Sequence, residues 1–150
     1  MRVAFFGHAS FHATEEIKEN LMRILKNITD EGDVEFFFGG YGQFDSFALS
    51  CVMKIRSSNK LTRTFVTPYI TEDYQKNHLS TAKELFDNIV YPPIESVPLK
   101  FAISARNKWI GANSDVVICY VSHGYGGAYT ACKHAKRHGV QILNLADFEI

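Results

Sequence analysis

Residues 115–121 (DVVICYV), followed at once by residues 122–127 (SHGYGG), carry the clearest signal of the fold of this chain. The apolar run lacks polar alternation, which is typical of a strand buried on both faces of a sheet. The glycines predict a tight turn after the strand, and residues 128–135 then place alanine and cysteine at helical spacing. A strand, a glycine turn and a helix in this order form the repeating unit of an α/β fold.

The same unit occurs twice more near the N-terminus. Residues 3–6 are an apolar run and residues 34–38 are apolar except for Glu35, and each of the two segments is followed by glycine. The helices expected after these strands carry apolar side chains at helical spacing over residues 17–28 and 44–55. Thr14 is expected to cap the first helix, because two glutamates follow it and the positive end of a helix favours negative charge.

The rest of the chain supplies further elements of the same kinds. We expect strands at residues 64–67 and 140–145, a helix at residues 101–111, a short helix opened by a capping box at residues 81–84 and a short strand at residues 89–91. Residues 70–100 are less regular and resemble an excursion from the sheet. The prediction is one α/β domain over residues 1–150, a three-layer Rossmann-like fold with a mostly parallel sheet and helices on both faces.

The composition limits the classes of function. Of the 150 residues 46% are hydrophobic, and 16 basic and 16 acidic residues cancel to zero net charge. We therefore expect no nucleic acid as partner, because neutralising phosphates requires clustered lysine and arginine. No apolar run is long enough to span a membrane, so we expect no membrane partner, and the N-terminus lacks the organisation of a signal peptide.

The three cysteines bear on the cellular compartment. Cys51 and Cys132 lie on apolar faces of expected helices, and Cys119 lies in the middle of an expected strand. Their spacing does not suit a metal, so we expect buried, reduced thiols. Reduced thiols fit a cytoplasmic location.

Three turns that are polar or rich in glycine follow three strong strands. They are residues 7–10 (GHAS), 39–45 (GGYGQFD) and 122–127 (SHGYGG). Parallel sheets bind ligands beyond the carboxyl ends of their strands, and glycine lets a ligand approach main-chain N–H groups, which favour phosphate at a helix N-terminus. The alternative is plain turn chemistry. The candidate ligand-binding residues are Gly7, His8, Gly39, Gly40, Gly42, Asp45, Arg106, Asn107, Ser122, His123, Gly124, Gly126 and Gly127.

Asp45 and Arg106 are the candidate catalytic residues. Asp45 follows a glycine turn, where a carboxylate accepts hydrogen bonds from sugar hydroxyls in nucleotide folds; its alternative is an interaction with the N-terminus of its own helix. Arg106, with Asn107 beside it, is expected to grip a phosphate, the alternative being a surface ion pair. Neither glycine turn has the spacing of a Walker loop or of a dinucleotide fingerprint, which disfavours ATP hydrolysis and hydride transfer.

The histidines leave several roles open. His8 and His123 end two strands, where each either hydrogen-bonds a ligand, acts as acid or base, or is satisfied by the backbone. His134 and His138 lie four residues apart without a third ligand. We therefore expect no metal and no cofactor.

Several of these motifs resemble the SLOG superfamily, the Rossmann-like group that includes the Smf/DprA and Lonely-Guy proteins. The resemblance rests on residues 39–45 (GGYGQFD), 106–110 (RNKWI), 114–118 (SDVVI) and 124–128 (GYGGA), and it extends over residues 2–145. The likeness is greatest to small stand-alone members. It implies a nucleotide or nucleotide-derived ligand in the glycine turns, and a homodimer or higher homo-oligomer.

The resemblance also raises the question of catalysis. Lonely-Guy enzymes cleave the base–ribose bond of nucleotides, and Arg106, Gly124 and Gly126 match their motif, whereas Thr130 stands where that motif has glutamate. Losing one electrostatic stabiliser costs about 10²–10³ in rate. The expected function is therefore binding of a nucleotide or ADP-ribose-like ligand as sensor or carrier. The alternative is an N-glycosidase or phosphoribohydrolase that uses Asp45, and a third reading is a scaffold with a vestigial site.

Overall fold

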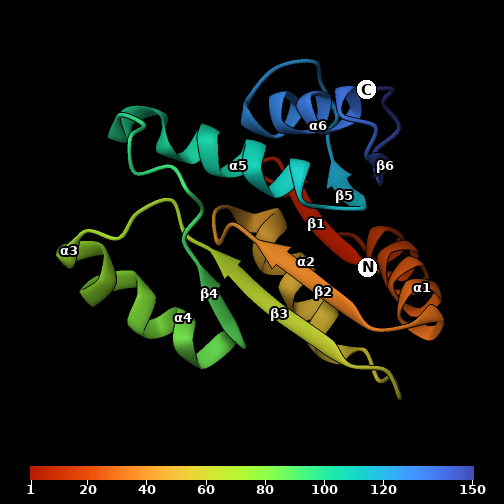
Figure 1. The fold of residues 1–150 in the computed structure, drawn as a ribbon. Helices are drawn as coiled ribbons and strands as arrows, with labels where there is room; N and C mark the ends of the chain where they lie inside the picture. Colours follow the sequence, from red (N-terminus) through yellow and green to blue (C-terminus); the bar gives the residue numbers. More distant parts are fainter.

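A computed structural model describes residues 1–150 and contains one six-stranded sheet (Figure 1). All neighbouring strands are parallel, and their order across the sheet is β4-β3-β2-β1-β5-β6. The strands are β1 (Arg2–Gly7), β2 (Val34–Phe38), β3 (Leu61–Val66), β4 (Asn88–Val90), β5 (Val116–Tyr120) and β6 (Gln141–Asn144). The prediction of a mostly parallel sheet is confirmed.

Helices cover both faces of the sheet. The long helices are α1 (Glu15–Glu31), α2 (Gln43–Lys54), α5 (Ala102–Ala112) and α6 (Gly127–Arg137). Apolar side chains buried from α1 and α2, such as Leu21 and Phe44, belong to one hydrophobic cluster. Those buried from α5 and α6, such as Ile110 and Cys132, belong to another on the opposite face. This arrangement confirms the three-layer, Rossmann-like fold that the alternating elements predict.

Strand β1 shows why its sequence is an unbroken apolar run. Val3 and Phe5 belong to the cluster with α1 and α2, whereas Ala4 and Phe6 belong to the cluster with α5 and α6. Successive side chains of a strand face opposite sides, so a strand covered on both faces needs apolar residues at every position. The apolar run thus fits the place of β1 in the middle of the sheet.

Helix α1 begins where its capping signal lies. The Thr14 side chain accepts a hydrogen bond from Ile17 N at 3.2 Å, and Glu15 and Glu16 occupy the first turn. The predicted cap is confirmed.

The helical segment between β3 and β4 begins earlier than the sequence predicts. It starts with α3 (Glu72–Tyr74), continues through a π-helical turn at Gln75–Leu79 and ends with α4 (Ser80–Leu85). The Thr71 hydroxyl caps its start by accepting a hydrogen bond from Tyr74 N at 3.4 Å. A helix at residues 81–84 is therefore confirmed, but the capping box expected there is wrong, because Thr81 lies inside a helix that has already begun.

The same excursion adds the short strand predicted near residues 89–91. Strand β4 pairs with β3 in parallel, with Phe65 opposite Ile89. The excursion packs back on this edge of the sheet, where Phe65, Leu79 and Ala82 form a small buried cluster. The chain therefore leaves the sheet after β3 and returns to extend it by one strand.

Strand and helix ends shift by a few residues elsewhere. Strand β3 begins at Leu61, earlier than the expected residues 64–67, because Leu61 and Thr62 pair with Val34 and Glu35 of β2. A 3₁₀ turn at Leu99–Phe101 precedes α5. The start of β3 is set by pairing with the neighbouring strand β2, and the local sequence does not predict such pairing.

The three cysteines are buried, as predicted, and the structure pairs none of them. A hydrogen bond with Cys132 and burial both raise the pKa of the Cys119 thiol. No helix of the structure has the length and apolar character needed to cross a membrane.

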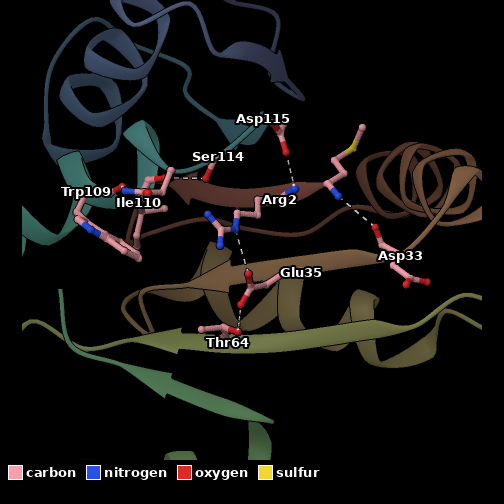
Figure 2. Close-up of polar contacts among 10 residues, drawn as sticks. Arg2, Asp33, Glu35, Thr64, Trp109, Ile110, Ser114 and Asp115 are labelled. Atoms are coloured by element: carbon pink, nitrogen blue, oxygen red, sulfur yellow. Dashed lines mark hydrogen bonds and ion pairs between the residues drawn. The ribbon is translucent and has the colours of Figure 1, made fainter.

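Polar contacts link the strands toward the amino end of the sheet, as Figure 2 shows. Arg2 Nε donates to Glu35 Oε1 at 3.2 Å, and the Thr64 hydroxyl donates to Glu35 Oε2 at 2.7 Å. The Arg2 amide donates to the Asp115 carboxylate at 2.7 Å. These contacts connect β1, β2, β3 and the start of β5. They lie at the amino end of the sheet, away from the turns that follow the strands.

Candidate ligand pocket at the carboxyl end of the sheet

The strand order places a switch point beside β1. From β1 the chain builds β2, β3 and β4 on one side, and then crosses over to build β5 and β6 on the other side. Open α/β sheets bind ligands in the crevice outside the strand ends at such a point. A cavity of about 390 Å³ lies there.

The turns after β1, β2 and β5 all contribute to this cavity, together with α5. Its lining residues are Phe5, Phe6, Gly7, His8, Ala9, Ser10, Gly39, Tyr41, Asp45, Ile103, Arg106, Asn107, His123, Gly126, Gly127 and Ala128.

Two helices begin at the cavity without a side-chain cap. Gly42 and Gly126 are the N-cap residues of α2 and α6, and neither helix has a capping side-chain hydrogen bond. In α6 the Thr130 amide donates to Gly126 O at 3.0 Å, so the amides of residues 127–129 come before the first bond of the helix. Amides in the first turn of a helix carry partial positive charge and favour an anion.

Asp45 organises the glycine turn after β2. Its carboxylate is buried and accepts a hydrogen bond from Gly40 N. Burial raises the pKa of Asp45 to about 6, against the lowering effects of the Gly40 amide, the Arg106 charge and the Tyr41 and Gly39 amides. The carboxylate therefore lines the cavity while it holds the turn in shape.

Arg106 is held in place from several directions. Only 2% of the residue is exposed, and Nη1 donates to Gly39 O at 2.9 Å and to Val66 O at 2.8 Å. Its Nε donates to Asn107 Oδ1 at 2.9 Å. Nη2 makes no hydrogen bond within the chain, and it is not sealed from solvent. The guanidinium is thus fixed by two strand-end carbonyls, and one of its nitrogens is free to bind a ligand.

Gly39 makes this placement of Arg106 possible. A Cβ atom added at Gly39 would lie 3.0 Å from Arg106 Cζ and 3.1 Å from Nη2. The absence of a side chain at this position therefore lets the guanidinium lie against the turn.

His8 links the turns after β1 and β5. Its Nε2 accepts a hydrogen bond from Ser122 N at 3.0 Å, which assigns the ring proton to Nδ1. Burial lowers the pKa of His8, and the neighbouring His123 lowers it further. His8 is therefore satisfied partly by the backbone, one of the roles that the sequence leaves open, while its ring still lines the cavity.

The structure brings most of the predicted site residues together. Those that line the cavity are Gly7, His8, Gly39, Asp45, Arg106, Asn107, His123, Gly126 and Gly127, whereas Gly40, Gly42, Ser122 and Gly124 lie in the same turns without lining it. Arg106 is not the surface residue of the alternative interpretation, because it is buried.

Sequence reasoning missed several lining residues. Ala9, Ser10 and Tyr41 belong to turns that the sequence analysis identifies as candidate ligand sites. Their position in these turns is the sequence signal that could have placed them in the cavity. Ile103 lies three residues before Arg106 on α5, and helical spacing places the two on one face. The two phenylalanines at the end of β1 carry no signal beyond their place in the strand.

Comparisons with known proteins address the fold. No protein-family model matches the chain, and no curated protein matches it. DNA processing protein A from Helicobacter pylori, whose structure concerns a unique single-stranded DNA binding mode, has a TM-score of 0.63 at 18% identity, over 96% of this chain and 64% of that one. DNA processing protein A (DprA) from Streptococcus pneumoniae has a TM-score of 0.64 at 17% identity, over 95% of this chain and 49% of that one. The chain thus spans less than two thirds of either protein.

One expectation is corrected by this comparison. Zero net charge predicts no nucleic-acid partner, but the H. pylori protein, which has this fold, binds single-stranded DNA. The exclusion is wrong because net charge sums the whole surface and does not report the local distribution of charge that a nucleic acid meets. The fold implied by the resemblance to Smf/DprA proteins is confirmed: the chain has the Rossmann-like fold of DNA processing protein A.

Proposed function

We propose that the cavity binds the phosphate of a nucleotide or nucleotide-derived ligand, such as an ADP-ribose-like molecule, in a sensor or carrier. The observation that carries this proposal is the free Nη2 of Arg106, a nitrogen without a partner in the chain on a side chain that is otherwise buried and bonded. A charged donor forms its strongest hydrogen bonds with an ionised acceptor. A phosphate oxygen is such an acceptor, and the guanidinium suits its geometry.

The groups around Arg106 favour the binding of an anion. The uncapped start of α6 adds amides to the same cavity, through Gly127 and Ala128. The carboxylate of Asp45 accepts a hydrogen bond from Gly40 N in the turn after β2. The volume of about 390 Å³ falls within the range of about 300–1,000 Å³ that is usual for small-molecule sites.

Cleavage of the base–ribose bond is the second candidate. It is favoured by Asp45, which lines the cavity with a pKa raised by burial to about 6, a value suited to acid–base chemistry. We rank it below binding, because Asp45 already accepts an amide and Thr130, at the position of the Lonely-Guy glutamate, does not line the cavity. Chromatography for released base after incubation with nucleoside monophosphates tests it, with Asp45→Asn as the inactive variant.

Single-stranded DNA is a further source of the same phosphate chemistry. The fold shared with the H. pylori protein supports including it as a ligand. An oligothymidylate therefore belongs among the compounds tested beside free nucleotides.

Titration calorimetry tests the binding proposal. Wild-type protein is titrated with AMP, ADP-ribose, NAD, cyclic ADP-ribose isomers and the oligothymidylate. Arg106→Lys keeps the positive charge but loses the planar, rigid set of guanidinium N–H donors. We expect this variant to weaken binding at least about tenfold. Arg2→Lys is the matched control, because Arg2 lies at the opposite end of the sheet. Folded wild-type protein that binds none of these compounds would refute the proposal.

The homo-oligomer, the stand-alone character and the cytoplasmic location stay predictions. Leu99 and Phe101 in the 3₁₀ turn before α5 and Ile103 in its first turn are exposed apolar side chains and form the candidate contact surface. Sedimentation equilibrium of the wild type and of Phe101→Asp tests whether the chain self-associates through this surface.

A further inference from the structure

Three aromatic rings form a stack beside the cavity. The rings of His8 and His123 have centroids 3.9 Å apart at an interplanar angle of 14°, and those of His123 and Tyr125 are 3.9 Å apart at 20°. His8 follows β1, and the other two residues follow β5. The stack therefore bridges the switch point of the sheet.

The inner part of the stack is held by the backbone. His8 Nε2 accepts the Ser122 amide at 3.0 Å, and His123 Nδ1 lies 3.1 Å from the Tyr125 carbonyl oxygen. Both histidines line the cavity. Their positions are thus set before any ligand binds, which lowers the entropic cost of extending the stack.

The outer ring of the stack is open to solvent. Tyr125 is 70% exposed, although one face of its ring lies on His123. Its other face is therefore uncovered. Tyr125 does not itself line the cavity, but it stacks on His123, which lines it together with Arg106.

We propose that the free face of Tyr125 is a stacking platform for a nucleobase. This inference rests on the proposed function and deepens it, because it requires a ligand that carries a base as well as a phosphate. Every nucleobase has a π-face that stacks on an aromatic side chain, and the ring spacing already present suits such a stack. The base belongs either to a free nucleotide or to single-stranded nucleic acid.

Calorimetry with ligands that differ by the base tests the platform. Wild-type protein is titrated with each of the four ribonucleoside monophosphates, with ribose 5-phosphate and with an oligothymidylate. We expect the base to improve affinity about 5- to 150-fold over ribose 5-phosphate. Tyr125→Ala and Tyr125→Leu are expected to remove this difference, whereas Tyr125→Phe keeps it. Leu85→Ala is the control, as a large exposed apolar residue outside both the cavity and the candidate contact surface.

The outcomes separate the two proposals. If ribose 5-phosphate and every monophosphate bind with equal affinity, the platform is overturned and phosphate binding stands. A preference for the base that survives in Tyr125→Ala also overturns the platform. Absence of binding to all of these compounds overturns both proposals. Tighter binding of the oligothymidylate than of the monophosphates, lost in Tyr125→Ala, supports the platform and assigns the base to a single strand.

Discussion

Gly39 and Arg106 share a space that leaves no room for a second side chain. Nη1 of Arg106 donates to two carbonyl oxygens, so a shift of the guanidinium away from an added methyl group would strain those hydrogen bonds. We predict that Gly39→Ala lowers the free energy of unfolding by about 1–3 kcal/mol through overpacking and weakens ligand binding. Urea denaturation and calorimetry measure both effects.

Gly32→Ala is the control for this prediction, because a Cβ atom at Gly32 meets no atom within 4 Å. It should change the free energy of unfolding by less than about 0.5 kcal/mol. Equal stability of the two variants would contradict the close approach of Arg106 to Gly39.

Asp45 makes stability depend on pH. Burial raises its pKa from 3.8 to about 6, so between these values the folded state holds a proton that the unfolded state releases. The stability contributed by Asp45 is therefore full below about pH 4 and is lost as the pH rises to about 6, by on the order of 3 kcal/mol. The pH dependence of the difference in unfolding free energy between the wild type and Asp45→Asn measures this. A titration midpoint near pH 4 for this carboxyl by NMR would contradict it.

Among the helices, α1 and α6 differ in whether a side chain accepts hydrogen bonds from the N–H groups of the first turn. Thr14 caps α1, whereas α6 begins at Gly126 with no capping side chain. The sequence signals for the two are distinct, a hydroxyl followed by glutamates in one case and glycines in the other. The pattern at residues 81–84 shows the limit of such signals, because a helix that has already begun overrides a local cap.

Gly127 offers a test of the anion site at α6. A side chain at Gly127 meets no atom within 4 Å, and the residue lines the cavity. We predict that Gly127→Asp places negative charge in the first turn, leaves the helix stable and weakens binding of a phosphate ligand at least about tenfold relative to Gly127→Ala. Calorimetry on the two variants measures the ratio, and equal affinities would show that the amides of α6 take no part.

Across the molecule, a bound ligand would join both halves of the sheet. The cavity is lined by turns after β1, β2 and β5, so the ligand binds the folded state alone. At 100 times its Kd, it should raise the free energy of unfolding by about 2.7 kcal/mol, and Tm by about 5–10 °C. Thermal denaturation with and without ligand measures this shift. Arg106→Lys, with affinity weakened at least about tenfold, should lose about half of the shift or more at the same ligand concentration.

The strands, most helices and the three turns of the site could be predicted from the sequence, because apolar runs, capping residues and glycines act locally. Which turns meet, and what each side chain does there, follows only from the assembled fold. Arg106 bonds to a carbonyl 67 residues away, and His8 accepts an amide 114 residues away. Such contacts depend on the order of the strands in the sheet, which no local pattern encodes.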